Sequence, residues 1–440
     1  MNKPLTKEQQ MSPDSIWKEQ QVSRRGFMKS AFVGGAALSL SGRLALAEQM
    51  VSGRLSAEDI HGAGVRPGVV RLSSNENPMG PSPQALRIVA DKMFDVNRYS
   101  IYTNYPDGYF SGLGDPDTRT PLVETLAEHD GVELSPKTRS SSSRSFGSSS
   151  PPPTPYIVSS GSGPLLYLLA LAYLSQGGGE VIEADAGYNS VSRKAESFNE
   201  VGIPTKVISV PLTADYRHDL PAMRAAMTPN TSMVVITNPN NPTGTLLSYE
   251  ELEQFVNSVP KSVIIVIDEA YIHFARDLNY KRAIPLALAN ENVVVLRTFS
   301  KVYGLPAMRL GYSVSSKAIQ QRILFYAADS IPGVLTQMAG MEAVTDYNHV
   351  RKSQQAVWDF QDTCYAAFER MGLEYIPSSG NFLQVRVGKN RDAIDDALDE
   401  RNVQVSSRGG DRMAEWLRIS AGTARETEVF LNEFESAIKV

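Results

Sequence analysis

Three side chains that could take part in chemistry lie just after runs of apolar residues. They are Asn241, Asp268 and Lys301, and the runs before them are 233–237, 263–267 and 293–296. Apolar runs without polar alternation are typical of strands that are buried on both faces, as in a parallel sheet. Because the carboxyl ends of parallel strands meet at one edge of a sheet, we expect the amide, the carboxylate and the amine to converge there.

Two further side chains add to this set. Tyr271 follows Asp268 closely, and Arg309 comes shortly after Lys301. Pyridoxal 5′-phosphate needs a lysine that bonds to its aldehyde and an acid that keeps its ring nitrogen protonated. It also needs hydroxyl groups and an arginine around its phosphate. The combined set therefore predicts a pyridoxal-phosphate site.

Three motifs occur in order along the chain. They read Asn-Pro-Thr-Gly at 241–244, Asp-Glu-Ala-Tyr at 268–271 and Ser-Lys-x-x-Gly-x-x-x-x-Arg-x-Gly at 300–311. In this order and at these spacings they resemble class I/II aminotransferases of fold type I, and most of all histidinol-phosphate aminotransferases. The resemblance covers the chain from about residue 72 to the C-terminus. It implies an α/β fold, with a large, mostly parallel α/β/α cofactor domain and a smaller α+β C-terminal domain.

The resemblance implies a role for each residue of this site. Lys301 would hold the cofactor and, once released from it, would move a proton between the substrate and the cofactor. Asp268 would keep the ring nitrogen protonated, while Asn241 and Tyr271 would bind the phenolic oxygen of the ring. The cofactor phosphate would be held by Ser162, Gly163, Thr298, Ser300 and Arg309, and by Tyr105, which would reach across a homodimer interface.

Tyr105 and three further residues to which the resemblance gives a role each have a competing interpretation. Tyr105 carries the family's Pro-Asp turn, but Tyr99 is a second candidate for the residue that crosses the interface. Tyr188 matches the aromatic that stacks on the pyridine ring, although a strand end can hold a purely structural tyrosine. Asn75, in an Asn-Glu-Asn-Pro segment, would line the substrate entrance or form an ordinary turn. Arg418 matches the arginine for a substrate anion, whose fork suits a carboxylate or phosphate; the alternative is a salt-bridge partner.

Two features depart from the family's pattern. The segment 135–155 is rich in serine and proline, and such a composition cannot bury a core, so we expect a disordered or surface loop. Residues 161–163 form a glycine loop before a helix expected over 164–174, and a helix N-terminus favours an anion. Pro164 removes one backbone donor from this loop, and Leu166 excludes a dinucleotide fingerprint.

The beginning of the chain reads as an export signal. Arg24 and Arg25 precede Phe27 and a weakly apolar segment, 31–46, which ends in a small-x-small cleavage pattern. This arrangement resembles a twin-arginine signal, which implies that the precursor meets the twin-arginine export machinery and that the mature protein is periplasmic. We expect the signal at 1–47, an N-terminal arm at 48–96, the large domain at 97–318 and the small domain at 319–440.

The composition argues against several other classes of protein. A net charge of −5 over 440 residues argues against a nucleic-acid partner. The single cysteine, Cys364, excludes an internal disulfide and a cysteine metal cluster. The five histidines show no metal-ligand spacing, so we expect no metal, and we expect His273 to pack in the interior. No apolar run of the mature body is long enough to span a bilayer.

These observations favour a pyridoxal-phosphate-dependent aminotransferase with a ping-pong cycle. It would move an amino group from an amino acid, or from a histidinol-phosphate-like amine, to a 2-oxo acid. A fold type I decarboxylase or lyase has the same cofactor residues and is the first alternative. A non-catalytic exported binding protein is the second, but a binding protein would not need Lys301. Because histidine synthesis is cytoplasmic, we expect an exported enzyme to use an amino acid or a small carboxylated amine.

Overall fold

The computed structural model describes residues 68–93, 96, 120–134, 154–277, 280–327 and 332–439. The paired arginines, both candidate interface tyrosines and nearly all of the serine and proline tract lie outside these residues, so what we expect of them stays a prediction. No helix in the described part of the chain has both the length and the apolar content needed to cross a membrane.

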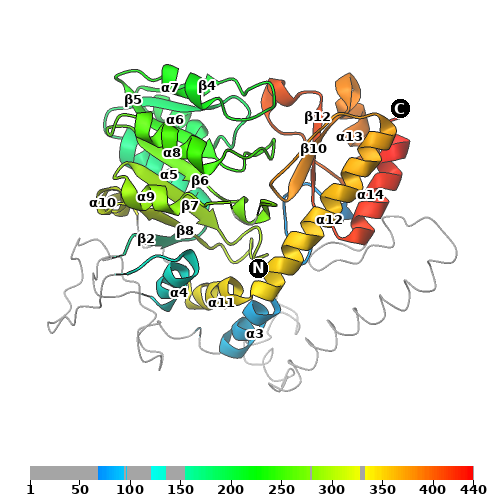
Figure 1. Ribbon diagram of the computed structural model, residues 1–440, viewed down its shortest axis with the longest axis horizontal. Helices are drawn as coiled ribbons and strands as arrows, with labels where there is room; N and C mark the ends of the chain where they lie inside the picture. Colours follow the sequence, from blue (N-terminus) through cyan, green and yellow to red (C-terminus); the bar gives the residue numbers. More distant parts are fainter. Residues whose placement is uncertain are drawn as a thin grey trace, which may run out of the picture. The chain divides into compact units, whose positions relative to one another are not determined.

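A seven-stranded sheet lies at the centre of the fold (Figure 1). Its order is β2 (Tyr156–Ser159), β8 (Gly311–Ser315), β7 (Val293–Thr298), β6 (Ile264–Asp268), β5 (Thr231–Thr237), β3 (Gly179–Ala184) and β4 (Thr205–Val210). The strands from β7 to β4 pair in parallel, whereas β8 runs antiparallel to both of its neighbours. The three apolar runs are therefore adjacent parallel strands, β5, β6 and β7, as predicted.

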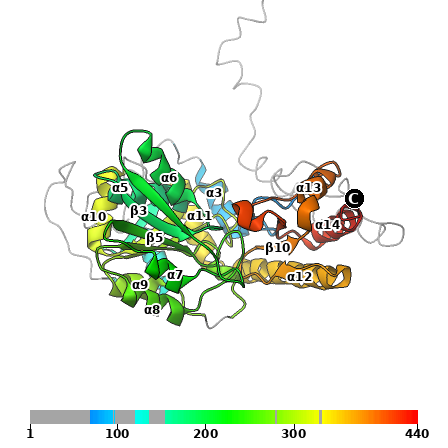
Figure 2. The ribbon, with the colours of Figure 1, turned by 90° about the horizontal axis from the view of Figure 1, so that it is seen from above.

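Helices cover both faces of this sheet. On one face lie α5 (Ser162–Leu174), α6 (Ser190–Asn199) and α10 (Lys317–Tyr326). Their side chains Leu165, Val191 and Ile319 belong to one hydrophobic core with Val266 and Val294 of the sheet. On the opposite side lie α7 (Leu220–Ala225), α8 (Tyr249–Ser258) and α9 (Ile284–Ala289), as Figure 2 shows. This arrangement confirms the predicted α/β fold with a mostly parallel sheet.

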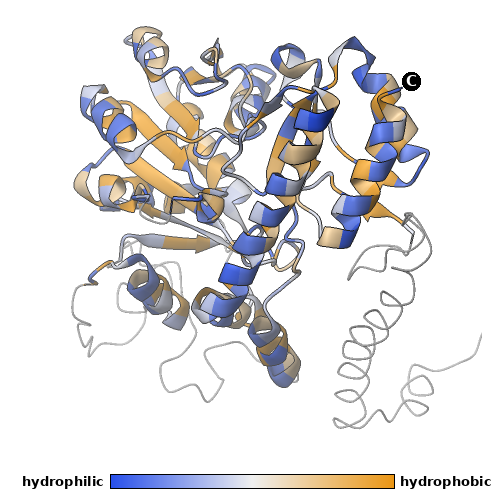
Figure 3. Cartoon of the chain, turned by 45° about the vertical axis from the view of Figure 1, so that its right-hand side comes forward, coloured by the Kyte–Doolittle hydropathy of each residue, from blue (hydrophilic) through white to orange (hydrophobic). Residues whose placement is uncertain are grey.

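Burial of apolar side chains explains why these runs form the central strands. Every residue of β6 and β7 is buried, and valine, isoleucine and leucine make up most of both strands. Burying such a side chain completely contributes roughly 1.5–3 kcal/mol relative to leaving it exposed. In Figure 3 the strands carry mainly the hydrophobic colour, and the hydrophilic colour gathers on the helices.

The C-terminal part of the chain forms a second, smaller sheet with its own helices. Its strands are β9 (Tyr375–Ile376), β10 (Phe382–Arg386) and β12 (Trp416–Ser420), paired antiparallel in the order β12-β10-β9. Its helices are α12 (Tyr347–Met371), α13 (Arg391–Asp399) and α14 (Ala424–Ala437). The N-terminal segment joins this part, because β1 (Val70–Arg71) pairs in parallel with β11 (Val403–Gln404). Leu72 continues the connection, since its carbonyl oxygen accepts a hydrogen bond from the backbone N–H of Ser420.

The remaining elements within the described ranges are three helices and three short 3-10 helices. They are the helices α3 (Pro83–Lys92), α4 (Pro121–Asp130) and α11 (Val334–Thr345), and the short 3-10 helices η5 (Ile272–Phe274), η6 (Gly388–Asn390) and η7 (Gly410–Met413). α11 packs against both α3 and α4. The expected division at residue 319 falls within α10, which packs on α5 of the large sheet. The domain limits themselves stay predictions.

Candidate active site

The carboxyl ends of the central strands bring the predicted polar groups together around Lys301. This lysine follows β7, and its Nζ donates hydrogen bonds to the carbonyl oxygens of Ser74 (3.3 Å) and Asn75 (3.1 Å). The same Nζ lies 5.5 Å from the ring centroid of Tyr271, which follows β6. The N-terminal segment therefore contacts the lysine directly, beside the end of the sheet.

Tyr271 connects this segment to the motif after β5. Its hydroxyl accepts hydrogen bonds from Nδ2 of Asn75 (3.1 Å) and from Nδ2 of Asn241 (3.3 Å). Burial raises the pKa of this hydroxyl, so it keeps its proton at neutral pH. Because both bonds are accepted, the proton is free to be donated to an oxygen of a bound molecule.

Arg418, on β12, completes the same group of side chains. Its Nη1 donates to Oδ1 of Asn241 (2.9 Å), and its Nη2 donates to the carbonyl oxygen of Ser73 (2.8 Å). Its Nε is buried and has no hydrogen-bond partner among the described residues. Burial lowers the pKa of the guanidinium to about 10. A buried cation that is bonded only to neutral oxygens is suited to receive an anion.

Two glycines allow three elements to meet at the N-terminus of α5. Gly161 has a φ of 107°, and a Cβ there would lie 2.6 Å from Nη2 of Arg309. A Cβ on Gly311, at the start of β8, would lie 2.5 Å from the backbone nitrogen of Ser162. Gly161 therefore leaves room for Arg309, and Gly311 leaves room for the first amide of α5, because neither position has a side chain. A helix N-terminus beside an arginine favours a phosphate.

Hydroxyl groups at the end of β7 lie next to the N-terminus of α5. Thr298 pairs with Gly311 in the sheet, and its Oγ1 donates to Oγ of Ser300 (3.1 Å) and accepts from the backbone N–H of Ser300 (3.2 Å). Gly163 is the second residue of α5, which begins at Ser162 rather than at the expected residue 164. The helix thus supplies two N–H groups before Pro164 interrupts the series.

Comparison with known proteins decides the family. The model of the family described as Aminotransferase class I and II matches residues 67–434. The chain belongs to the class I and II aminotransferases. Histidinol-phosphate aminotransferase of Akkermansia muciniphila is 35% identical to it, over 81% of this chain and 87% of that relative. Histidinol-phosphate aminotransferase of Moorella thermoacetica is 33% identical, over 82% of this chain and 84% of that relative.

Solved structures share the fold of this aminotransferase. Histidinol-phosphate aminotransferase from Sinorhizobium meliloti, in complex with pyridoxal-5'-phosphate, matches with a TM-score of 0.70 at 22% identity, over 84% of this chain and 91% of that one. Aspartate aminotransferase from Thermus thermophilus with maleate matches with a TM-score of 0.65 at 22% identity, over 91% of this chain and 96% of that one. The predicted fold type I architecture is confirmed, and the enzyme is a pyridoxal-phosphate-dependent aminotransferase.

The residues of this aminotransferase fit the cofactor. Asp268 is 3% exposed, and burial raises the pKa of its carboxyl to about 7. The N–H of Ala270, which donates to its Oδ1 (3.1 Å), acts in the opposite direction, and the neighbouring Glu269 raises the pKa again. A protonated ring nitrogen would supply the positive charge that lowers this pKa, because an opposite charge nearby favours the ionised carboxyl.

The environment of Lys301 suits an amine that must bond and exchange protons. Burial, assisted by the positive charge of Arg418, lowers the pKa of its Nζ to about 8. The carboxylates of Glu76 and Asp268 act in the opposite direction. Near pH 8 about half of the amine is neutral. A neutral amine can attack an aldehyde or accept a proton.

The structure thus groups the predicted site residues in two sets. The first set, joined by hydrogen bonds and one ring contact, is Asn75, Asn241, Tyr271, Lys301 and Arg418. The second set, around the start of α5, is Ser162, Gly163, Thr298, Ser300 and Arg309. Tyr188 is 39% exposed, and Asp268 ends β6 between the two neighbouring strands. The roles of these residues toward the cofactor stay predictions.

Sequence reasoning missed two residues that hold the N-terminal segment over Lys301. Ser420 Oγ accepts from the backbone N–H of Asn75 and donates to its Oδ1, both at 2.8 Å. Asn381 Nδ2 donates to the carbonyl oxygens of Asn75 (2.9 Å) and Glu76 (3.1 Å). These contacts join residues that are 345 and 306 positions apart. The only signal in the sequence was that both residues adjoin an apolar run.

Proposed function

We propose that this aminotransferase acts on an amino acid or another small carboxylated amine, with a 2-oxo acid as the acceptor. The observation that carries the proposal is the buried guanidinium of Arg418, which bonds only to neutral oxygens and keeps its Nε without a partner among the described residues. A substrate carboxylate would give this cation its counter-ion, and a planar fork binds a carboxylate with defined orientation.

Each residue then has a task at a stated atom. When bound, pyridoxal phosphate supplies an aldehyde that takes up the amino group and a ring that accepts electrons. Asp268 holds a proton at the ring nitrogen through its carboxylate. Lys301 accepts and returns a proton at Nζ. Arg418 orients the substrate through its carboxylate, so that the carbon to be deprotonated faces that Nζ.

The proposal extends to location and assembly. The paired arginines, the weakly apolar segment and the cleavage pattern support export of the precursor by the twin-arginine machinery and a periplasmic mature enzyme. The absence of any need for a disulfide fits this route, because the chain can fold before export. A homodimer in which Tyr105 reaches the cofactor phosphate of the other subunit is part of the same proposal.

Histidinol phosphate is the second candidate substrate. It is favoured by the two relatives described above, both named histidinol-phosphate aminotransferase. The fork of Arg418 would satisfy a phosphate as well as a carboxylate. Location argues the other way, because histidine synthesis is cytoplasmic and an exported enzyme would be poorly placed to serve it.

A donor screen on the mature protein, residues 48–440, separates these candidates. Amino acids, small carboxylated amines and histidinol phosphate would each be tested with a panel of 2-oxo acids, and kcat/KM would be compared. We expect the highest value for a carboxylate donor. Turnover of histidinol phosphate that is far faster than that of every carboxylate donor would refute the proposal and favour the second candidate.

A further inference from the structure

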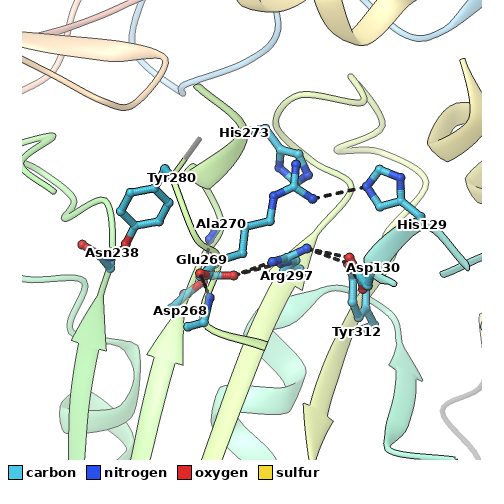
Figure 4. Close-up of polar contacts among 12 residues, drawn as sticks. His129, Asp130, Asn238, Asp268, Glu269, Ala270, His273, Tyr280, Arg297 and Tyr312 are labelled. Atoms are coloured by element: carbon cyan, nitrogen blue, oxygen red, sulfur yellow. Dashed lines mark hydrogen bonds and ion pairs between the residues drawn. The ribbon is translucent and has the colours of Figure 1, made fainter. Parts of the chain in front are cut away.

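A buried ion-pair network that has no part in the tasks above lies beside Asp268 (Figure 4). Its centre is Arg297 on β7, which is 1% exposed. Nε and Nη2 of Arg297 donate to Oε2 of Glu269 (3.0 and 2.7 Å), and Nη1 donates to Oδ1 of Asp130 (2.8 Å). The side chains of both acidic partners have no exposed surface. One guanidinium therefore bridges two buried carboxylates, and its single positive charge can compensate only one of them.

The two carboxylates depend on Arg297 to different degrees. Asp130 Oδ2 also accepts hydrogen bonds from the hydroxyls of Tyr156 (3.2 Å) and Tyr312 (3.1 Å). Glu269 keeps, among the described residues, one other donor, the backbone N–H of Ala283 (2.7 Å). Without the guanidinium, Asp130 would retain two hydroxyl donors, whereas Glu269 would become a buried charge with a single amide. Glu269 is thus the acid whose charge Arg297 chiefly compensates.

Glu269 and Asp268 are consecutive residues at the end of β6. Successive side chains of an extended chain leave the backbone on opposite sides. The N–H of Glu269 donates to the carbonyl oxygen of Leu296 (2.9 Å), which places Glu269 next to Arg297 on the neighbouring strand. Figure 4 shows the Glu269 carboxylate directed to Arg297, with Asp268 immediately before it in the chain. Two carboxylates this close repel each other, and repulsion favours the protonated form of one of them.

We propose that Arg297 is a positioning residue that acts through Glu269: it holds Glu269 in a neutral pair, so that Asp268 keeps its negative charge toward the ring nitrogen of the cofactor. This inference does not depend on which amine the enzyme accepts. The other titratable groups around the network and Asp268 are Tyr156, Tyr312, Tyr280, Tyr303, His129, His273, Arg282 and Lys301. Burial raises the pKa of the four tyrosines and lowers the pKa of both histidines, so these six groups are uncharged at neutral pH.

The test compares two variants of the full chain. Arg297→Met removes the compensating charge, and Arg297→Met combined with Glu269→Gln removes both charges. The single variant should bind pyridoxal 5′-phosphate about fivefold or more weakly at pH 7, because an uncompensated like charge nearby raises a carboxyl pKa by about one unit or more and so lowers the ionised fraction of Asp268. The pH below which the visible absorbance of the bound cofactor is lost should rise by about one unit. The double variant should return to near the wild-type dissociation constant and pH profile.

A matched control and a second variant keep the outcome decisive. Arg386 also bridges two carboxylates, Glu374 and Glu415, but on the exposed surface, so Arg386→Met should leave cofactor binding unchanged. A double variant that binds the cofactor no better than Arg297→Met would overturn the proposal. A purely structural role for Arg297 predicts no recovery of binding when Glu269 is also replaced. If Arg297→Met does not fold, Arg297→Lys decides. Lysine keeps the positive charge but lacks the planar guanidinium, so this variant should have a lower Tm and unchanged cofactor affinity and pH profile. A weaker affinity or a shifted pH profile would overturn the proposal.

Discussion

Replacing Arg418 by methionine would remove the substrate's proposed counter-ion and keep an apolar stem beside Phe382, whose ring lies 5.6 Å from the guanidinium carbon. Losing one partner of a buried, hydrogen-bonded charge pair costs about 2–5 kcal/mol. Because about 1.4 kcal/mol corresponds to tenfold, kcat/KM for a carboxylate donor should fall by roughly 30-fold to several thousand-fold.

The same substitution should have a much smaller effect on folding. Burial lowers the pKa of Arg418 from 12.5 to about 10, so keeping its charge without a substrate costs the folded protein about 3 kcal/mol. Removing the guanidinium relieves this cost but gives up the hydrogen bonds to Asn241 and Ser73, each of which contributes roughly 1.5–3 kcal/mol. The two effects oppose each other, so the free energy of unfolding should fall by no more than about 3 kcal/mol.

The assay compares a carboxylate donor with the amine that lacks its carboxyl group. Arg418→Met should lose far more activity toward the first donor than toward the second, whose smaller loss reflects the effect of Arg418 on Lys301, whereas Arg386→Met, which breaks an exposed pair of salt bridges, should change neither. Thermal unfolding reports the stability of each variant. An equal loss for both donors would refute the reasoning, because it would mean that Arg418 acts on the cofactor site and not on the substrate anion.

Three further predictions concern the lysine, a buried acid and the export signal. Borohydride should abolish the visible absorbance of the purified enzyme and leave a pyridoxyl group on Lys301; a labelled peptide that is still recovered from Lys301→Ala would show that another lysine carries it. Burial raises the pKa of Glu183 to about 7, so ionising it in the folded state costs stability as pH rises from about 4.5 to 7, up to about 3 kcal/mol in total. Glu183→Gln should therefore match the wild type near pH 4.5 and exceed it in free energy of unfolding above pH 7; parallel pH curves from urea titrations would contradict this. Replacing Arg24 and Arg25 together by lysine should leave uncleaved precursor in the cytoplasm, and normal processing in a fractionation experiment would argue against the twin-arginine signal.

The large sheet could be predicted from the sequence because its central strands are continuous apolar runs, which are typical of buried parallel strands. Val293–Thr298 and Ile264–Asp268 are mostly apolar and every residue in them is buried, and the polar residues at their ends meet because parallel strands bring those ends together. The sequence predicts that this helix begins at residue 164, whereas α5 begins two residues earlier, at Ser162. Gly161, with its positive φ, directly precedes the helix and lets it begin at Ser162, before the proline that we took as its first residue.

Neither the ion-pair network around Arg297 nor the hydrogen bonds that hold the N-terminal segment over Lys301 could be predicted in the same way. Arg297 reads in the sequence as a polar residue at a strand end, yet it is nearly inaccessible to water, because Glu269 and Asp130 reach it from a neighbouring strand and from α4. Ser420 meets Asn75 because β12 of the C-terminal sheet lies beside the N-terminal segment. Neither contact follows from local propensity or periodicity, since each depends on elements far apart along the chain.

The contact between Asn75 and Ser420 bears on when a newly made chain can close its N-terminal segment over Lys301. These residues are separated by 345 positions, and Asn75 also touches Lys301 and Tyr271. A ribosome that has read only as far as Ser406 has made the lysine but neither Arg418 nor Ser420. Contacts of such high sequence separation are slow to form. The N-terminal segment can therefore be held over Lys301 by Ser420 only after β12 has been synthesised, and a chain cut short before β12 should keep Lys301 but lose this contact.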